Sequence, residues 1–441
     1  MKAHNAIDES AVARKITRRI VPLLFVLYII SYLDRVNIGY AALQMNRELA
    51  LTSEAFGFAS GIFFIGYFIF EIPSNLMLTK YGARIWIGRI LLTWGVVAMI
   101  SAFAQNAMQL YVLRFLLGVA EAGFFPGIIL YLTNWFRAKD LATTLALFLS
   151  AIPVSFIIGA PVSTWIMDHI QWFEWSGWRW MLFLEGVPAL IGAIVCFLYL
   201  TDRPGDANWL KPEEREWLTN ELDRERKSRP RARHHGSLNA MANPKVLYLA
   251  FIYFVSQCAS FGIGYWMPQI INSFPQALSH TQVGLVAMIP YTFTMIVMVL
   301  WSRRSDRLNE RRLHSAAPLA ITGLALLGVG LTTNPYMSML MISLSLAGLY
   351  ASKSPFWALS TEFLPASTAA VSIAVINSVG NLGGFFGPYV IGYVKGWAHS
   401  TTAGFIAFSG LFVISFLMTL FIRTGQQHAQ ASTGAISEHN G

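Results

Sequence analysis

The sequence has few charged residues and almost no cysteine. Only 12% of its 441 residues are Asp, Glu, Lys or Arg, whereas about a quarter is usual in soluble domains. Because 55% of the residues are also hydrophobic, the composition excludes a water-soluble globular protein. The two cysteines, Cys196 and Cys258, both lie in apolar segments. They provide neither a disulfide framework nor a cysteine metal site, and we interpret them as packed thiols.

Motifs for catalysis are missing as well. The sequence contains no cluster of metal ligands, no nucleophile with an adjacent base and no glycine-rich phosphate loop, and most histidines lie in tails and loops. We therefore expect no enzymatic activity, no metal and no cofactor. No pattern indicates nucleic acid or an obligate protein as a partner.

Long hydrophobic runs, in contrast, fill most of the chain. About 20 apolar residues suffice to cross the hydrocarbon core of a membrane. Twelve such runs predict an all-α integral membrane protein, and the even number puts both termini on one side. The predicted spans are 20–40, 55–78, 84–103, 108–131, 141–164, 180–201, 245–270, 282–301, 314–332, 337–359, 367–391 and 401–422.

Basic residues indicate which side this is. Most of the 32 Lys and Arg fall in the termini and in the alternate loops on the same side, and basic loops stay in the cytoplasm. We therefore predict cytoplasmic termini and a multi-pass protein of a bacterial inner membrane. The net charge of +9 reflects this topology and favours contact with anionic lipid.

A polar stretch divides the spans into two sets of six. We predict a helix bundle at 1–201, a cytoplasmic linker at 202–244, a second bundle at 245–423 and a disordered tail at 424–441. The linker sequence "LKPEEREWLTNELDRERK" is typical of an amphipathic surface helix, and the basic stretch "SRPRARHHG" follows it. Two similar halves are the layout of alternating-access transporters, which bind substrate near the midplane of the membrane.

Seven strings spread over the chain form a recognisable set: "SYLDRVNIG", "FEIPSN", "LRFLLGVAEAGFFPG", "GWRWMLFLEGVPA", "YWMPQII", "PFWALSTEFL" and "INSVGNLGGFFGP". Together they resemble one transporter family, the anion:cation symporters of the major facilitator superfamily. The resemblance covers nearly the whole chain and, within the family, is greatest to bacterial permeases for tartrate, sugar acids, phthalate and hydroxyphenylacetate.

The loop motif of the superfamily, G-x-x-x-D-[RK]-x-G-R-[RK], is met in part after the second and the eighth spans. Asn75 and Thr79 depart from it in the first copy, and Ser302 and Asn309 in the second. The resemblance implies that the matching positions belong to a cytoplasmic gate. These positions are Lys80, Gly82, Arg84, Asp306, Arg307 and Arg311.

Five ionisable side chains that lie inside predicted spans are Asp34, Arg35, Arg114, Glu121 and Lys353. Each costs roughly 2.5–3.5 kcal/mol at mid-membrane unless it pairs or faces water. At about 1.5 Å of rise per residue, Asp34 and Arg114 reach the same depth, so we expect them to form an ion pair. Glu121 lies two turns after Arg114 on the same helix face. The first bundle should therefore contain a polar track.

The resemblance implies roles for this track. Asp34 and Glu121 match positions linked to proton coupling, and Arg35 and Arg114 match positions linked to the substrate carboxylate and its salt bridge. Tyr32, Tyr67, Trp357 and Asn377 are substrate contacts by the same resemblance or, alternatively, packed side chains. Trp266 and Gln269, three residues apart near the outer end of the seventh span, are further candidates or, alternatively, interfacial residues.

Lys353 departs from the family pattern, in which we expect a small or uncharged residue. It either neutralises Glu121 or Glu362 or is a second cationic contact for the substrate, and the sequence leaves both readings open. Glu71 and Glu185 lie nearer span ends, and we interpret them as structural.

The resulting hypothesis is a proton-driven symporter that imports a small organic anion. The candidate substrates are carboxylates such as tartrate, a sugar acid, phthalate or hydroxyphenylacetate, and the choice between a monoanion and a dianion stays open. An uncoupled facilitator and a non-transporting membrane sensor are the alternatives.

Overall fold

The fold of the described residues is entirely helical. The computed structural model describes residues 7–228, 243–308, 310–364, 369–398, 400 and 403–422, and every regular element in these ranges is a helix. The elements are α1 (Glu9–Glu48), α2 (Ser53–Tyr81), α3 (Ala83–Ser101), α4 (Ala107–Glu121), α5 (Phe124–Thr133), α6 (Ala138–Leu149), α7 (Ala151–His169), η1 (Trp172–Glu174), α8 (Gly177–Tyr199), η2 (Pro204–Asp206), α9 (Pro212–Ser228), α11 (Pro244–Asn272), α12 (His280–Leu308), α13 (Arg312–Leu331), α14 (Pro335–Phe363), α15 (Ala369–Asn381), α16 (Gly383–Ala398) and α17 (Ala403–Leu420).

Ten helical segments of the described chain are long and apolar enough to cross a membrane. They coincide with ten of the twelve ranges predicted from the sequence. The other two ranges are helical as well, but they do not meet the same standard. The helix α14 carries Lys353 and several serines, and the segment at 367–391 is interrupted, which leaves α15 with 13 residues and α16 with 16.

The helices group into two compact units. The first unit comprises Met1–Ala50 and Ile62–Arg231, and the second comprises Leu51–Gly61 and Ala232–Gly441. The first turns of α2 thus group with the second unit. The basic stretch that follows α9 and the predicted tail at 424–441 lie outside the described residues.

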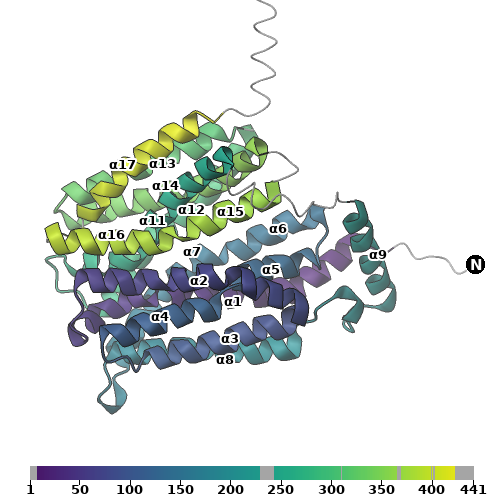
Figure 1. The fold of residues 1–441 in the computed structure, drawn as a ribbon, viewed down its shortest axis with the longest axis horizontal. Helices are drawn as coiled ribbons and strands as arrows, with labels where there is room; N and C mark the ends of the chain where they lie inside the picture. Colours follow the sequence, from purple (N-terminus) through teal and green to yellow (C-terminus); the bar gives the residue numbers. More distant parts are fainter. Residues whose placement is uncertain are drawn as a thin grey trace, which may run out of the picture. The chain divides into compact units, whose positions relative to one another are not determined.

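Glycine allows two helices of the first unit to approach closely. A Cβ atom on Gly118 of α4 would meet the backbone oxygen of Phe63 on α2, and one on Gly66 of α2 would meet the backbone oxygen of Phe115 on α4. Elsewhere in this unit α3 and α8 run side by side, and α1 packs on α7 and α8 (Figure 1). The contact between α2 and α4 brings the polar face of α4 towards α1.

The fourth apolar segment is broken directly after Glu121. The helix α4 ends at this residue, and Gly123 adopts a left-handed conformation with φ of 82° before α5 begins. A side chain at Gly123 would also meet the hydroxyl of Ser74. Interrupted helices of this kind are tolerated inside membranes where the freed backbone is buried in protein or lines a cavity. The break therefore places a carboxyl group at an irregular point of the backbone.

The second unit has a similar break between α15 and α16. Gly383 and Gly387 at the start of α16 lie against the backbone of α11 near Cys258, where no Cβ atom would fit. The helices α11, α15 and α16 pack together, and α13 packs against α14 and α17. Side chains of α11 can therefore reach the end of α15.

The helix α9 runs across the ends of the membrane-spanning helices of its unit (Figure 1). Leu218 and Leu222 are buried, and Lys15 of α1 donates a hydrogen bond of 2.8 Å to Glu214. Although burial opposes it, this bond and one from the Lys211 amide lower the pKa of Glu214 below its ordinary value. The linker segment is thus docked on the first unit through both apolar and charged contacts.

Candidate functional site

Arg35 and Glu121 form an ion pair in the interior of the first unit. The Arg35 side chain is almost buried and Glu121 is fully buried, with 0% exposure. Ser31, one turn before Arg35 on α1, donates a second hydrogen bond of 2.6 Å to the same oxygen of Glu121, Oε1. The other oxygen, Oε2, is buried and has no hydrogen-bond partner among the described residues. Glu121 therefore has one saturated oxygen and one that could take a proton.

Asp34 is held by a different partner. Its side chain is 1% exposed, and its Oδ2 accepts a hydrogen bond of 2.6 Å from Nε1 of Trp94 on α3. Its Oδ1 is buried without a hydrogen-bond partner in the described part of the chain. The aspartate thus resembles Glu121 in having one oxygen bound by a donor and one left for a proton.

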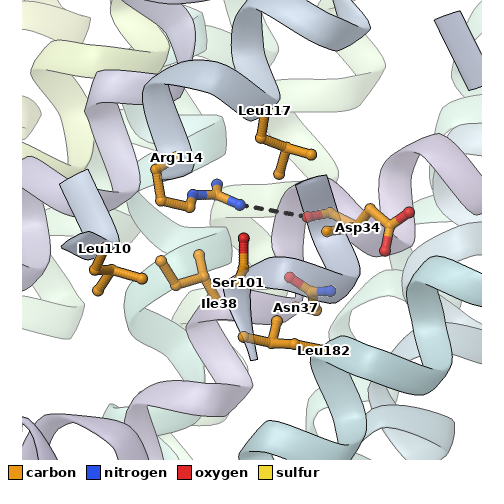
Figure 2. A pocket seen from close by; sticks show the side chains of 9 residues that line it. Asp34, Asn37, Ile38, Ser101, Leu110, Arg114, Leu117 and Leu182 are labelled. Atoms are coloured by element: carbon orange, nitrogen blue, oxygen red, sulfur yellow. Dashed lines mark hydrogen bonds between the residues drawn. The ribbon is translucent and has the colours of Figure 1, made fainter. Parts of the chain in front are cut away.

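Arg114 contacts the backbone of α1 instead of forming the predicted side-chain pair with Asp34. Its guanidinium donates to the carbonyl oxygens of Asp34 at 3.4 Å and of Arg35 at 3.2 Å. In Figure 2 the dashed line from Arg114 ends on the backbone oxygen of Asp34, while the carboxylate points away from it. The depth of the residues along their helices therefore correctly predicted a contact between α1 and α4. It could not predict the rotation of α1 about its axis, which turns the Asp34 side chain towards α3.

Aromatic rings surround the guanidinium of Arg35. Its Cζ lies 5.0 Å from the ring centroid of Tyr32, 5.3 Å from that of Phe63 and 5.4 Å from that of Tyr67. Phe63 also lies 5.3 Å from the Cζ of Arg114. Electrostatic attraction to the ring faces supports both cations without neutralising them. The sequence singled out the two tyrosines but missed Phe63, since one more phenylalanine in an apolar helix carries no signal.

A small cavity lies beside Asp34 and Arg114 (Figure 2). Its volume is about 10 Å³, and its polar lining comes from Asp34, Asn37, Ser101 and Arg114. This is close to the smallest volume that holds one water molecule.

In the second unit Lys353 lies in a row of amides. Its Nζ is 3.3 Å from Oε1 of Gln257, and Nε2 of Gln257 is 3.4 Å from Oδ1 of Asn381 at the end of α15. The lysine Nζ also lies 4.2 Å from the ring centroid of Tyr350. Within the described part of this unit no ion pair includes Lys353, and Glu362 is exposed. The contacts of Lys353 inside its own unit are therefore with neutral groups.

The other predicted residues of this unit fall into two groups. Trp357, one turn after Lys353, packs on the ring of Tyr253 at 4.9 Å, and Asn377 lies on α15 one turn before Asn381. These residues lie in helices that carry the amide row.

Trp266 and Gln269 belong elsewhere. The Trp266 indole is fully buried and donates to the backbone oxygen of Pro388 at 3.1 Å, and Gln269 accepts from Lys395 at 3.4 Å. Trp266 is nine residues from Gln257 on α11, which is about 13 Å along the helix. The structure therefore does not bring Trp266 and Gln269 together with Lys353.

The first loop motif makes local contacts. Gly82 has φ of 86°, and a Cβ atom there would lie 2.8 Å from Oδ1 of Asp202. The same carboxylate accepts from the backbone N–H of Arg84 at 2.8 Å, and the Arg84 Nε donates to the carbonyl oxygen of Phe197 at 2.6 Å. Lys80 lies over the ring of its neighbour Tyr81. Gly82 and Arg84 thus fix the turn between α2 and α3.

The second motif contains an ion pair of its own. Arg311 pairs with Asp306 and donates to the hydroxyl of Ser305 at 3.2 Å, whereas Arg307 is exposed. In this copy the ion pair of Arg311 and Asp306 stabilises the turn between α12 and α13. In the first copy the turn is stabilised by Gly82 and by the contacts of Asp202.

Comparison with known proteins agrees with the fold. The sequence model of the Major Facilitator Superfamily matches residues 24–388 and 276–437. A "Putative tartrate transporter" of Agrobacterium vitis is 46% identical over 95% of this chain and 95% of its own length. A quinolone resistance transporter of Acinetobacter baumannii is 36% identical over 96% of this chain and 98% of its own length.

A solved structure has the same fold. The bacterial homologue of the human lysosomal transporter Spinster, in an inward-facing and unoccupied conformation, aligns with a TM-score of 0.74. The alignment covers 92% of this chain and 97% of that one at 15% identity.

Proposed function

Because this chain belongs to the Major Facilitator Superfamily, a superfamily of membrane transporters, we propose that it is a proton-coupled symporter that imports a small organic anion by alternating access. The single observation that carries this proposal is the buried pair of Arg35 and Glu121. A buried ion pair that only stabilised the helices would satisfy both carboxylate oxygens, whereas Oε2 of Glu121 has no hydrogen-bond partner among the described residues.

The pair suggests how proton and substrate are coupled. While Glu121 is ionised, it occupies the guanidinium of Arg35. A proton on Glu121 neutralises the carboxylate and releases Arg35, whose planar fork can then hold a substrate carboxylate through two hydrogen bonds. The aromatic rings around Arg35 keep it oriented without competing for that charge. Asp34, with its own open oxygen, is the second candidate carrier of a proton.

We infer that the substrate is a dicarboxylate such as tartrate. Relatives named for tartrate are 46% identical to the chain. Lys353 adds a cation whose contacts with the described residues of its unit are with neutral groups, which favours a substrate with a second carboxylate. Trp357 and Asn377 accompany it as proposed substrate contacts, and Tyr32 and Tyr67 accompany Arg35. Trp266 and Gln269 have a weaker claim because of their separation along α11.

The proposed topology has twelve spans in two halves, with both termini in the cytoplasm of a bacterial cell and the protein in the inner membrane. It is supported by the helical ranges at all twelve predicted positions and by the distribution of Lys and Arg. The proposed boundaries are 1–201 and 245–423 for the bundles and 202–244 for the linker. The proposed gate lies at the two basic loops, around Arg84 and the pair of Asp306 and Arg311.

Uptake into proteoliposomes tests the proposal. Purified protein is reconstituted, an inward proton gradient is imposed, and labelled tartrate is followed with and without a protonophore. We expect accumulation above the external concentration that the protonophore abolishes, together with tartrate-dependent alkalinisation outside. Equilibration without accumulation would identify an uncoupled facilitator. If neither tartrate nor any other carboxylate is transported, the proposal is contradicted and the alternative of a non-transporting membrane sensor is favoured.

A further inference from the structure

Glu185 is a buried acid that the proposed mechanism does not use. It lies on α8, is 5% exposed and sits inside a segment apolar enough to cross a membrane. Its Oε2 accepts a hydrogen bond of 2.9 Å from Nδ2 of Asn37, and its Oε1 accepts one of 2.6 Å from the hydroxyl of Ser163 on α7. Both donors are neutral, and in the described part of the chain no ion pair includes Glu185. Its environment thus differs from that of Glu121.

The charged and titratable groups around Glu185 are few. The helix α8 packs against α1, α3 and α7. From α1, Asp34 and Tyr40 are close enough to interact with it electrostatically. From α7 the neutral Ser163 hydroxyl donates to Glu185, and the Trp94 indole of α3 is also neutral and is bound to Asp34. Glu185 therefore faces another carboxyl group rather than a cation.

Asn37 is hydrogen-bonded to Glu185 and lies on the same helix as Asp34. It follows Asp34 by three residues, so the two side chains share a face of α1. Its Nδ2 is used by Glu185, whereas its Oδ1 is buried without a hydrogen-bond partner among the described residues and the residue lines the same cavity as Asp34 and Arg114. Leu182, one turn before Glu185 on α8, lines this cavity as well. The cavity is thus lined by Asp34 itself and, on the side of Glu185, by Asn37 and Leu182.

The charges around Asp34 and Glu185 balance only if one of these two acids is neutral. Arg35 is paired with Glu121, and Arg114 is a cation that contacts the backbone of Asp34. Two carboxylates against one guanidinium would leave an excess negative charge among membrane-spanning helices, and like charges that share a site do not both ionise readily. A single proton removes the excess.

From this geometry we propose that Asp34 and Glu185 are a coupled pair of acids that share one proton around Asn37, and that Glu185 thereby sets the pH at which Asp34 ionises. Its role in transport rests on the proposed proton coupling, but the pair itself does not. Glu185 is a positioning residue for the proton on Asp34, since it contacts neither Arg35 nor Glu121 through its hydrogen bonds.

Trp94 provides a spectroscopic reporter of this pair. Because its indole N–H donates to Asp34 Oδ2 at 2.6 Å, its ultraviolet resonance Raman signal should follow the protonation of Asp34. The signal is isolated as the difference between the full-length protein and its Trp94→Phe variant, and it is titrated with pH. Coupled acids titrate in two steps, so we expect the wild-type signal to spread over a wider range than a one-proton curve.

Removal of the second acid should simplify the titration. In Glu185→Gln we expect a single one-proton curve, with a midpoint at least about one pH unit below the last wild-type step, a tenfold change in proton affinity. Ser163→Ala removes a hydrogen bond that stabilises ionised Glu185, so it should shift the midpoint in the same direction by a smaller amount. This variant replaces Glu185→Gln in the test if Glu185→Gln does not fold. Glu71→Gln, a buried acid of the same unit at 7% exposure, is the matched control and should leave the curve in place.

Wild-type and Glu185→Gln curves that both follow one proton with the same midpoint would overturn the proposal, as would unshifted curves for both Glu185→Gln and Ser163→Ala. The titration needs no substrate. If Glu185→Gln shifts the titration curve but the wild-type protein does not accumulate tartrate, the pair is supported and the proposed function is contradicted. If Glu185→Gln leaves the curve unshifted and the wild-type protein does accumulate tartrate, the pair is rejected and the proposed function stands.

Discussion

The guanidinium of Arg35 on α1 pairs with the carboxylate of Glu121 at the last residue of α4, where the helix breaks. This pairing differs from the one that depth along the helices favoured, Asp34 with Arg114. It also unites in one contact a residue proposed to bind substrate and a residue proposed to carry a proton. Any event that protonates Glu121 therefore changes the availability of Arg35.

Arg35→Lys tests the recognition of a carboxylate. Lysine keeps the positive charge but lacks the planar fork, so we expect the affinity for tartrate to fall by about tenfold or more at a site that uses two parallel hydrogen bonds. The change is measured as the half-saturating concentration in counterflow. Arg89→Lys, whose guanidinium lies 4.6 Å from the ring of Trp86, controls for the substitution itself. Unchanged affinity in Arg35→Lys would make Arg35 structural.

Lys353→Ala tests whether the substrate has a second carboxylate. Competition between tartrate and its monoamide is compared in wild type and variant. We expect the preference for tartrate to fall by at least about tenfold, because a lost charge-assisted hydrogen bond costs about 1.5–3 kcal/mol and every 1.4 kcal/mol is about tenfold. Lys395→Ala, which removes a lysine next to Trp266, should keep the preference. An equal preference in wild type and Lys353→Ala would show that Lys353 does not read the second carboxylate.

Trp94→Phe should destabilise the protein. It removes the donor of the 2.6 Å bond to Asp34 and leaves a second buried carboxylate oxygen without a partner, at a cost of about 1–3 kcal/mol. Thermal unfolding in detergent measures the effect. Trp86→Phe loses a bond of 3.0 Å to Ser74 at a less buried position and should lose less stability. Equal losses in both variants would argue against a special role of the Asp34 contact.

Gly118→Ala tests the close approach of α2 and α4. The added methyl group would meet the backbone oxygen of Phe63, which cannot rotate away, so we expect destabilisation of about 1–3 kcal/mol and weaker tartrate binding. At Gly410 of α17 an added Cβ atom would meet nothing within 4 Å, so Gly410→Ala should behave like wild type. A stable and fully active Gly118→Ala protein would contradict the packing.

The helices and the charged side chains of the candidate site could be predicted from the sequence, because both follow from the free energy of placing side chains in a membrane. Apolar runs long enough to cross a membrane predict helices, and an ionised residue such as Arg35 inside such a run is costly and therefore easy to identify. Pairing could not be predicted in the same way, since it depends on helix rotation and on the break at Gly123, neither of which periodicity reveals. Trp94 and Asn37 were missed because a tryptophan or an asparagine in a span is commonly a packed residue. Glu185 was interpreted as structural because its neighbours were unknown.

The most direct test of the account separates exchange from accumulation in Glu121→Gln. Glutamine has the shape of the protonated acid but cannot release a proton, so Arg35 stays available and the coupling step is lost. We predict that proteoliposomes with this variant exchange labelled tartrate for unlabelled tartrate at a rate near that of wild type, yet do not accumulate it under an inward proton gradient. Accumulation by Glu121→Gln to the wild-type level would contradict the claim that the Arg35–Glu121 pair couples protons to the substrate.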